Sequence, residues 1–282
     1  MYSFLKGQTA VVTGAGGTIG SEIARSLAKN GANVVLMGRT LEKLEKVKKE
    51  IEEDGGTAMA YACDMTDEKA VTEASKKITS ELGVCRFLIN CAGGNNIKAM
   101  TTLTKFADEE ISDDCPEGTV GFFNVDMEAY RSVLDINIMG TVIPSKVFGA
   151  QMAKEKKGSI LNFASMNTYT PLTRVAPYAM SKAAIANFTK WLGAYLAPSK
   201  IRVNAVAPGF FVNERSVQYL GTVENGLTER GKNVINHTPA GDFGKAKQLV
   251  GCVMWLLNDE TAEFVTGITV PVDGGFLSTT GV

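Results

Sequence analysis

The sequence predicts an α/β fold in which a parallel β-sheet of about seven strands carries helices on both faces. Two observations support this fold class. Short runs of β-branched residues alternate with amphipathic segments of helical period along most of the 282 residues. A glycine-rich turn also joins the first such run to the first helical segment. Because the chain has no internal repeat and no linker between two complete sets of elements, we expect one doubly wound domain over residues 1–282.

The alternation places the expected elements in order along the chain. The segment LEKLEKVKKEIEE, for example, has apolar residues at 41, 44, 47 and 51, which is typical of a surface helix lying on a sheet. Strands are expected at Thr9–Thr13, Asn33–Met37, Thr57–Tyr61, Phe87–Asn90, Ser159–Phe163, Ile201–Val206 and Gly267–Val270. Helices are expected at Ile19–Asn30, Leu41–Asp54, Glu68–Leu82, Met127–Lys154, Pro177–Leu196 and through Leu249–Leu257.

Two segments interrupt this rhythm. Residues 94–127 are polar and acidic, and we expect them to form an inserted loop. Residues 210–243 are rich in glycine and asparagine, and we expect an irregular lid over the substrate.

Composition and charge favour a small-molecule partner. Lys plus Arg (29) nearly balances Asp plus Glu (30), so no overall field draws the chain to nucleic acid or to a membrane surface. No run approaches the roughly 18 uninterrupted apolar residues of a membrane span, and the N-terminus lacks the pattern of a signal peptide. We therefore expect a soluble cytoplasmic protein. The five cysteines are odd in number and widely spaced, which favours buried thiols over a disulfide framework or a metal site, and no metal is predicted.

The turn TGAGGTIG, residues 13–20, is a candidate phosphate-binding loop. A strand that enters a helix through small residues directs free backbone N–H groups and the positive end of the helix dipole at one point, where a pyrophosphate fits. The dinucleotide pattern G-x-G-x-x-G read from Gly14 fails, because position 19 is isoleucine. A tight turn without a ligand therefore remains an alternative when this motif is taken alone.

A tyrosine and a lysine stand four residues apart in PYAMSK, residues 177–182. On a helix this spacing places Tyr178 and Lys182 on one face. A phenol has a reference pKa near 10, so it serves as a proton shuttle only if its anion is stabilised, which a neighbouring ammonium achieves. The pair alone is weak evidence, because such spacings occur by chance on surface helices.

Together these motifs resemble the short-chain dehydrogenase/reductase family over nearly the whole chain. The turn is similar to the family's T-G-x-x-x-G-x-G, apart from Thr18 at the middle glycine; NCAG at 90–93, Cys63-Asp64, Pro208-Gly209 and the closing GITVPVDGG also match. The resemblance implies a Rossmann-type fold and a catalytic set of Asn137, Ser165, Tyr178 and Lys182. It further implies cofactor contacts from Gly14, Gly16, Gly17, Thr18, Ile19, Gly20, Arg39, Asp64, Met65, Asn90, Ala92, Gly93, Tyr178, Lys182, Pro208, Gly209 and Asn213.

The identity of the cofactor depends on the end of the second strand. An acidic residue there binds the ribose 2′-hydroxyl of NAD, whereas an arginine accommodates the 2′-phosphate of NADP. The chain has Gly38-Arg39, which favours NADP. NAD remains open, because Arg39 could instead stack on the adenine or face water, and position 17 lacks a basic residue.

The segments expected around the substrate are polar, which favours a sugar acid over a steroid or fatty acyl group. The substrate candidates are Asn95, Lys98, Ser165, Asn167 and Arg174. The runs AGGNN, PLTR, APGFF and LTERG resemble the D-mannonate oxidoreductase (fructuronate reductase) branch of the family, although Asn96-Ile97 replaces a His-Pro pair of that branch. Either Arg174 or Lys98 is expected to pair with the carboxylate, and an ion pair at a subunit interface is the alternative for Arg174.

Other functions remain open at this point. Within the same class, a gluconate 5-dehydrogenase or a 3-oxoacyl-thioester reductase is the alternative. From a different class, a nucleotide-sensing binding protein is conceivable, and a methyltransferase is less favoured because it has no use for the Tyr/Lys pair. The family resemblance also implies a homotetramer that associates through the long helices after strands four and five.

Overall fold

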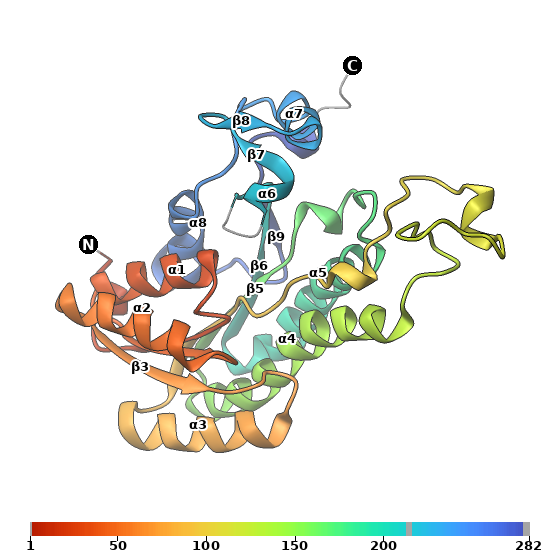
Figure 1. Ribbon diagram of the computed structural model, residues 1–282. Coiled ribbons are helices and arrows are strands. Elements are labelled where there is room, and N and C mark those ends of the chain that lie inside the picture. Colours follow the sequence, from red (N-terminus) through yellow and green to blue (C-terminus); the bar gives the residue numbers. More distant parts are fainter. Residues whose placement is uncertain (1, 213–215, 279–282) are drawn as a thin grey trace.

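The computed structural model describes residues 2–212 and 216–278. Seven strands form one sheet in the order β3-β2-β1-β4-β5-β6-β9, and every neighbouring pair is parallel (Figure 1). The strands are β1 (Thr9–Thr13), β2 (Asn33–Gly38), β3 (Thr57–Ala62), β4 (Cys85–Asn90), β5 (Gly158–Phe163), β6 (Ile201–Pro208) and β9 (Thr269–Val272). The chain winds outward from β1 to β3 on one side and from β4 to β9 on the other, so the predicted doubly wound fold is confirmed.

Helices cover both faces of this sheet (Figure 1). The helices of the sheet layers are α1 (Thr18–Lys29), α2 (Leu41–Glu53), α3 (Glu68–Leu82), α4 (Met127–Glu155), α5 (Ala176–Leu196) and α8 (Lys247–Leu257). The four-residue α9 (Asp259–Ala262) and the 3-10 turns η1 (Ser3–Leu5), η4 (Met166–Thr168), η5 (Ala197–Ser199) and η6 (Phe276–Ser278) complete the body.

The strand residues alternate between two hydrophobic cores. Ala10 and Val12 of β1 pack into the core that contains α1, α2 and α8, whereas Val11 packs into the core that contains α3, α4 and α5. Successive side chains of a strand point to opposite faces, so a strand covered on both sides is apolar throughout. This explains why β1 is buried at every position.

The predicted elements agree with the structure to within one or two residues at most ends. The last strand is the main difference, because it runs over Thr269–Val272 and not over Gly267–Val270. Gly267 has a φ of +78°, outside the strand region, so pairing starts after it. Pro271 is tolerated within β9 because this strand lies at the edge of the sheet.

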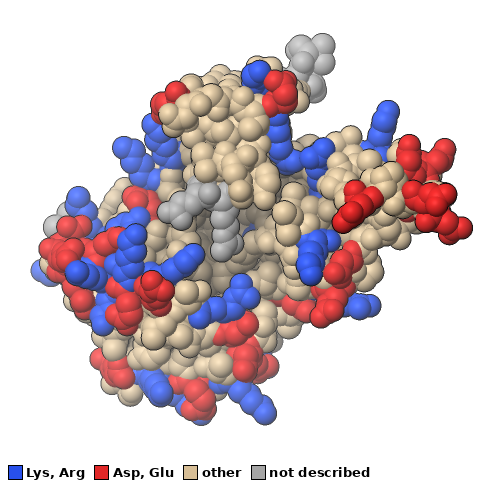
Figure 2. Space-filling view, viewed as in Figure 1, with Lys and Arg blue, Asp and Glu red and all other residues tan. Residues whose placement is uncertain are grey.

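Residues 94–126 leave the body as a long excursion between β4 and α4 (Figure 1). This insertion contains the 3-10 turns η2 (Ile97–Ala99) and η3 (Asp108–Ile111). Glu110 is its buried centre, since its carboxylate accepts hydrogen bonds from the backbone N–H groups of Phe123 (3.1 Å) and Ala107 (3.4 Å). Other acidic side chains cover the outer end of the insertion (Figure 2).

The segment expected to be irregular at 210–243 contains short regular elements, and that expectation was wrong in this respect. They are α6 (Val217–Leu220), the antiparallel hairpin of β7 (Gly221–Thr222) and β8 (Gly226–Leu227), and α7 (Glu229–Asn236). We call these elements the cap. They are too short for hydrophobic periodicity to reveal. The start of α7 does carry a local signal, because the hydroxyl of Thr228 accepts a hydrogen bond from the N–H of Gly231 at 3.0 Å.

Helix α4 is long and apolar enough, by length and composition alone, to cross a membrane. In the sequence, polar residues interrupt its apolar runs, so it does not show the roughly 18 uninterrupted apolar residues of a membrane span. Half of its most apolar window is buried inside the protein, where α4 packs against α3, α5 and β4. This environment is that of a core helix.

Candidate active site

A cavity of about 760 Å³ lies at the carboxyl ends of β1 and β4, between the body and the cap. Figure 2 shows the hollow below the cap. The chain turns in opposite directions from β1 and β4, so the loops after these two strands diverge and leave a crevice between them. The sheet topology therefore places the cavity where α/β proteins bind ligands.

The glycine turn forms one wall of this cavity. Gly14 has a φ of +64°, and a Cβ at this position would lie 2.7 Å from the carbonyl oxygen of Cys91. A Cβ at Gly20 would lie 2.5 Å from the carbonyl oxygen of Gly14. Both positions therefore require glycine, because the backbone folds closely on itself and on the loop after β4.

The first turn of α1 faces the same wall. Its N-cap residue, Gly17, has no side chain to bond the free N–H groups of Thr18, Ile19 and Gly20. These N–H groups and the helix dipole form an uncapped anion site, and the glycines allow a ligand close to the backbone. The residues present therefore fit the pyrophosphate of a dinucleotide cofactor.

Thr18, the one departure from the family's glycine pattern, is exposed and is the first residue of α1. It is not among the described residues with positive φ, so the backbone does not need glycine there. We expect Thr18→Gly to change the Kd for the reduced cofactor by no more than about threefold. Gly20→Ala should raise this Kd by more than about tenfold.

Fluorescence titration of each variant with NADH and NADPH measures these affinities. A large loss in Thr18→Gly would show that the threonine hydroxyl itself contacts a phosphate.

Two cations line the cavity beyond the end of β2. Arg39 follows the last residue of β2, and Lys43 lies one helical turn later in α2; both are exposed. Asp64 lies close enough for the charge of Arg39 to act on it. A hydrogen bond from the backbone of Thr66 is the main cause that lowers the pKa of Asp64, and Arg39 adds to it. Lys43 was missed in the sequence because the pattern of its segment predicts only a surface helix that lies on the sheet.

Tyr178 and Lys182 meet at the cavity wall from one face of α5. The Lys182 ammonium lies 5.4 Å from the centroid of the Tyr178 ring and donates a hydrogen bond to the carbonyl oxygen of Phe163 at 2.7 Å. Burial lowers the pKa of Lys182 to about 8. Burial raises the pKa of Tyr178, and a hydrogen bond with Ser165 opposes this effect.

Ser165 lies at the end of β5, where its hydroxyl oxygen accepts two hydrogen bonds. Both come from Asn167, through its backbone N–H at 3.2 Å and its side-chain amide at 3.3 Å. The side-chain oxygen of Asn167 in turn accepts a hydrogen bond from the backbone N–H of Leu172 at 3.0 Å. Because the lone pairs of Ser165 are engaged, its own hydrogen is left to donate into the cavity.

Asn137 is fully buried beneath the cavity floor. Its side chain exchanges two hydrogen bonds with the backbone of Gly94, at 2.8 and 3.2 Å, and donates a third to the carbonyl oxygen of Val133. A Cβ at Gly93 would lie 2.5 Å from the Asn137 oxygen and 3.6 Å from the Lys182 nitrogen. Asn137 therefore fixes the loop that passes beside Lys182.

The structure brings most of the predicted site residues to this one cavity. Those on its wall are Gly14, Gly16, Gly17, Thr18, Ile19, Gly20, Arg39, Met65, Ala92, Gly93, Asn95, Ser165, Tyr178, Lys182, Pro208 and Gly209. Six predicted residues do not line the wall, namely Asp64, Asn90, Lys98, Asn137, Asn167 and Arg174. Asn213 lies outside the described residues.

Asn90 is placed differently from a cofactor contact, because it is buried within the sheet. Its amide donates to the hydroxyl of Ser145 at 3.0 Å and to the side chain of Asn162 at 2.9 Å. Lys98 is exposed. Backbone hydrogen bonds lower the pKa of Asp126, the N-cap of α4, and the charge of Lys98 adds to this effect.

Several wall residues escaped the sequence analysis. They are mostly apolar residues for which no role in the site was predicted: Cys63, Cys91, Ile97, Met100, Ile136, Phe163, Phe211, Gln218 and Tyr219. Only the three-dimensional arrangement brings these residues to one surface.

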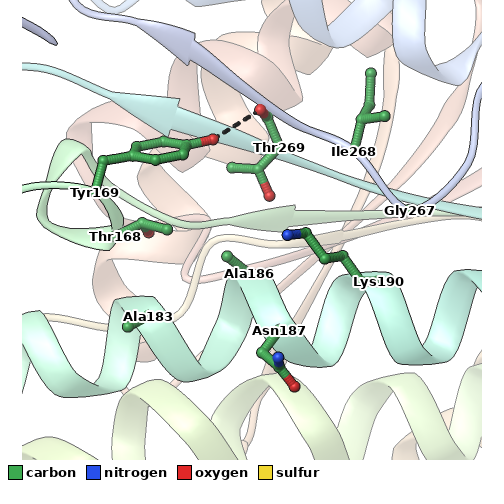
Figure 3. Close-up of a pocket in the computed structure, with 9 residues that line it drawn as sticks. All are labelled: Thr168, Tyr169, Ala183, Ala186, Asn187, Lys190, Gly267, Ile268 and Thr269. Carbon is green, nitrogen blue, oxygen red and sulfur yellow. Dashed lines mark hydrogen bonds between the residues drawn. The ribbon is translucent and has the colours of Figure 1, made fainter.

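A second hollow, of about 510 Å³, lies between α5 and the loop before β9 (Figure 3). Tyr169 crosses one side of it and donates a hydrogen bond from its hydroxyl to the carbonyl oxygen of Thr269 at 2.9 Å. None of the predicted site residues lines this hollow. The described residues also contain no group of three His, Cys, Asp or Glu side chains that could hold a metal ion. We therefore place the chemistry in the first cavity.

The comparisons with known proteins show which family the chain belongs to. The family described as short chain dehydrogenase matches residues 8–219, and the chain belongs to this family. The protein is an oxidoreductase that acts on CH–OH groups with NAD(P).

Three similar proteins span nearly the whole chain. An uncharacterized oxidoreductase from Bacillus subtilis, UxuB, is 40% identical over all of this chain and 99% of its own length. A crystal structure of a provisionally named D-mannonate oxidoreductase from Haemophilus influenza, with bound NAD, is 37% identical and has a TM-score of 0.92, covering 99% of this chain and 98% of that one. A gluconate 5-dehydrogenase from Gluconobacter oxydans is 29% identical over 96% of this chain and 95% of its own length.

Proposed function

We propose that the protein interconverts a hydroxyl and a keto group of a sugar acid, with D-mannonate and D-fructuronate as the best pair. The observation that carries this proposal is that Ser165, Tyr178 and Lys182 line the same cavity as the glycine turn. The similarity to the D-mannonate oxidoreductase supports the choice of substrate.

The nicotinamide cofactor, when bound, supplies or accepts the hydride. In reduction, Tyr178 donates a proton to the oxygen of the substrate carbonyl while Ser165 donates a hydrogen bond to the same oxygen. Burial raises the pKa of Tyr178, and the positive charge of Lys182 would oppose this effect by favouring the tyrosinate that remains after proton transfer. Asn137 holds the loop at Gly93 and Gly94 beside Lys182, and a water bound there would link Lys182 to solvent.

The polar substrate end supports a sugar acid over a fatty acyl group. Asn95 lines the cavity together with the hydroxyl-bearing Ser165 and Tyr178. Gluconate 5-dehydrogenase and 2-dehydro-3-deoxy-D-gluconate 5-dehydrogenase are also similar proteins, so a different sugar acid is the second candidate.

A spectrophotometric screen tests the proposal. The oxidation of NADH and of NADPH is followed with D-fructuronate, D-tagaturonate, 5-ketogluconate and an acetoacetyl thioester. We expect turnover with at least one keto sugar acid and none with the thioester. Turnover of the thioester alone would replace the sugar-acid assignment with that of an acyl reductase.

We propose that the protein uses NADPH in preference to NADH, because Arg39 and Lys43 stand together where β2 ends in Gly38. Exposed cations here would bind a 2′-phosphate, and no acidic residue at the strand end is present to bind the ribose. The double variant Arg39→Ser/Lys43→Ser should raise the KM for NADPH about tenfold or more and leave that for NADH within about twofold. Equal effects on the two cofactors would contradict a role at the phosphate.

We propose a homotetramer in which a second copy of the chain covers α5. Its outer face carries an unusual exposed aromatic stack: the Trp191 and Tyr195 rings lie 4.9 Å apart at 12°, and Phe188 stacks on Trp191. Exposed apolar patches of this kind mark interfaces. Trp191→Glu should therefore yield a smaller species in size-exclusion chromatography with light scattering. The control, Leu41→Glu on the exposed side of α2, should keep the wild-type mass.

We further propose that the cap acts as a lid, because Gln218 and Tyr219 of α6 line the cavity. A lid that closes over the substrate would exclude water from the reacting carbon.

A cytoplasmic location is consistent with the five free thiols.

A further inference from the structure

The segment that carries Ser165 is tied to helix α5 at both of its ends. It runs from Asn162, near the end of β5, to Thr168, the last residue of η4. At the first end, the side-chain amide of Asn162 donates a hydrogen bond to the hydroxyl of Thr189 at 2.9 Å. At the second end, the hydroxyl of Thr168 donates a hydrogen bond to the carbonyl oxygen of Lys182 at 2.9 Å. We call these two hydrogen bonds the tethers.

The groups that face the catalytic side chains of α5 lie between the tethers. The carbonyl oxygen of Phe163 accepts a hydrogen bond from the Lys182 ammonium at 2.7 Å, and Ser165 hydrogen-bonds Tyr178. On α5, the tethers end at Lys182 and Thr189, which lie on one face about two helical turns apart. A shift of the segment relative to α5 would therefore change both catalytic contacts at once.

The first tether belongs to a network of fully buried side chains. The side-chain oxygen of Asn162 accepts a hydrogen bond from the amide of Asn90 on β4 at 2.9 Å, and the same amide donates to Ser145 of α4 at 3.0 Å. The Thr189 hydroxyl in turn donates to the carbonyl oxygen of Ile185 at 2.8 Å. Because water does not compete for these hydrogen bonds, this end of the segment is fixed to the sheet and to both helices.

The second tether joins two catalytic segments through one half-buried residue. The backbone N–H of Thr168 donates to the carbonyl oxygen of Ser165 at 2.9 Å, while its hydroxyl bonds the carbonyl oxygen of Lys182. Figure 3 shows Thr168 on the loop that passes over α5, and η4 packs against this helix. Thr168 therefore connects the backbone of Ser165 directly to the backbone of Lys182.

We infer that Asn162 and Thr168 are positioning residues, which hold the segment of Ser165 at a fixed distance from α5; this inference rests on the catalytic roles proposed above. The Tyr178 and Lys182 side chains project from that helix, so their distances to the Ser165 hydroxyl depend on the tethers. Neither positioning residue lines the active-site cavity. Because a displacement of about 1 Å costs about 10²-fold in rate, the tethers should affect kcat strongly without touching the substrate.

The test compares variants of Thr168 that keep or remove its hydroxyl, with D-fructuronate as the substrate. Thr168→Val has a similar shape and lacks the hydroxyl, and we expect it to lower kcat about 10- to 100-fold with KM within about threefold of the wild type. Thr168→Ser keeps the hydroxyl and should retain kcat within about threefold. Thr168→Ala, compared with Thr168→Ser, removes the hydroxyl from the smaller side chain and should reproduce the loss.

The matched control is Thr170→Val, which changes an exposed threonine in the same loop and should keep the wild-type kcat. Circular dichroism verifies that each variant is folded. Wild-type kcat in folded Thr168→Val would overturn the inference. Equal losses in Thr168→Val and Thr168→Ser would also overturn it, because the packing of the side chain and not its hydrogen bond would then hold the segment.

A measurement without substrate separates this inference from the proposed function. NMR of the cofactor-free protein with isotope-labelled lysine follows the titration of Lys182, whose signal is assigned by its absence in Lys182→Met. The pKa of Lys182 should be about 8 in the wild type and should rise toward 10.5 in Thr168→Val, since a looser segment admits water to the buried ammonium. If this rise is found but no sugar acid is turned over, the positioning role stands and the sugar-acid function fails. An unchanged pKa of Lys182 in Thr168→Val would overturn the inference.

Discussion

Tyr178→Phe should reduce kcat by roughly 10²- to 10⁴-fold, because the variant loses the hydroxyl that, in the proposed mechanism, exchanges a proton with the reacting oxygen. The aromatic ring remains, so its contact with the Lys182 ammonium is kept. The free energy of unfolding should therefore change little. Steady-state kinetics with the substrate identified by the screen measures the loss, and fluorescence titration should find the affinity for the reduced cofactor within about twofold of the wild type.

Tyr169→Phe is the matched control for this experiment. Tyr169 is a half-exposed tyrosine nearby in the chain, whose hydroxyl bonds the carbonyl oxygen of Thr269 away from the cavity. Its variant should keep wild-type kcat. If Tyr178→Phe keeps full activity, another group must carry the proton, and the catalytic assignment fails. If the wild type binds the cofactor but reduces no carbonyl compound, the nucleotide-sensing alternative gains support.

The sheet and its helices could be predicted from the sequence because their patterns are local. Each helix of the sheet layers shows either a clear amphipathic period or a long apolar stretch between turn residues, and each strand is a short β-branched run. The glycine turn was likewise readable, since Gly14 and Gly20 are required by close backbone contacts that no other residue allows. Positions that accept only glycine can therefore be recognised in the sequence as a glycine pattern.

The cap and the full cavity wall could not be predicted, because they depend on contacts between distant segments. The two-residue strands β7 and β8 have no periodicity to detect. The pattern around Lys43 predicts only a surface helix, and the three-dimensional structure is needed to show that Lys43 lines the same cavity as the glycine turn.

Asn167 lies near the catalytic serine, as expected, but its contacts in the structure indicate a different role. The sequence suggested that it touches the substrate, whereas in the structure it is buried and bonds Ser165 with both its backbone and its side chain. Its polar groups are engaged, so we now propose that it positions the Ser165 hydroxyl. The sequence alone could not separate these two roles, since both need an amide two residues from the serine.

Lys182→Met should abolish most of the activity and, at neutral pH, stabilise the cofactor-free protein. Lys182 is buried, and burial lowers its pKa from 10.5 to about 8. The folded state therefore binds the lysine proton less tightly than the unfolded state does. The charged lysine thus lowers the free energy of unfolding. Methionine has a similar length and no charge, so the variant should gain roughly 1–3 kcal/mol at pH 7, reduced by the lost hydrogen bond to Phe163.

The sign of the pH dependence distinguishes this cause from simple repacking. Below pH 8 both states of the wild type bind the proton and the full cost is present; between about 8 and 10.5 the unfolded state binds more protons than the folded state, so the stability of the wild type rises with pH. The advantage of Lys182→Met should therefore shrink across this window, as measured by urea unfolding of the cofactor-free protein at a series of pH values. Lys190→Met, an exposed lysine on the same helix, should show no such trend. A constant advantage of Lys182→Met at every pH would mean that the gain comes from packing, and that the ammonium beside Tyr178 is not held in the site at the expense of stability.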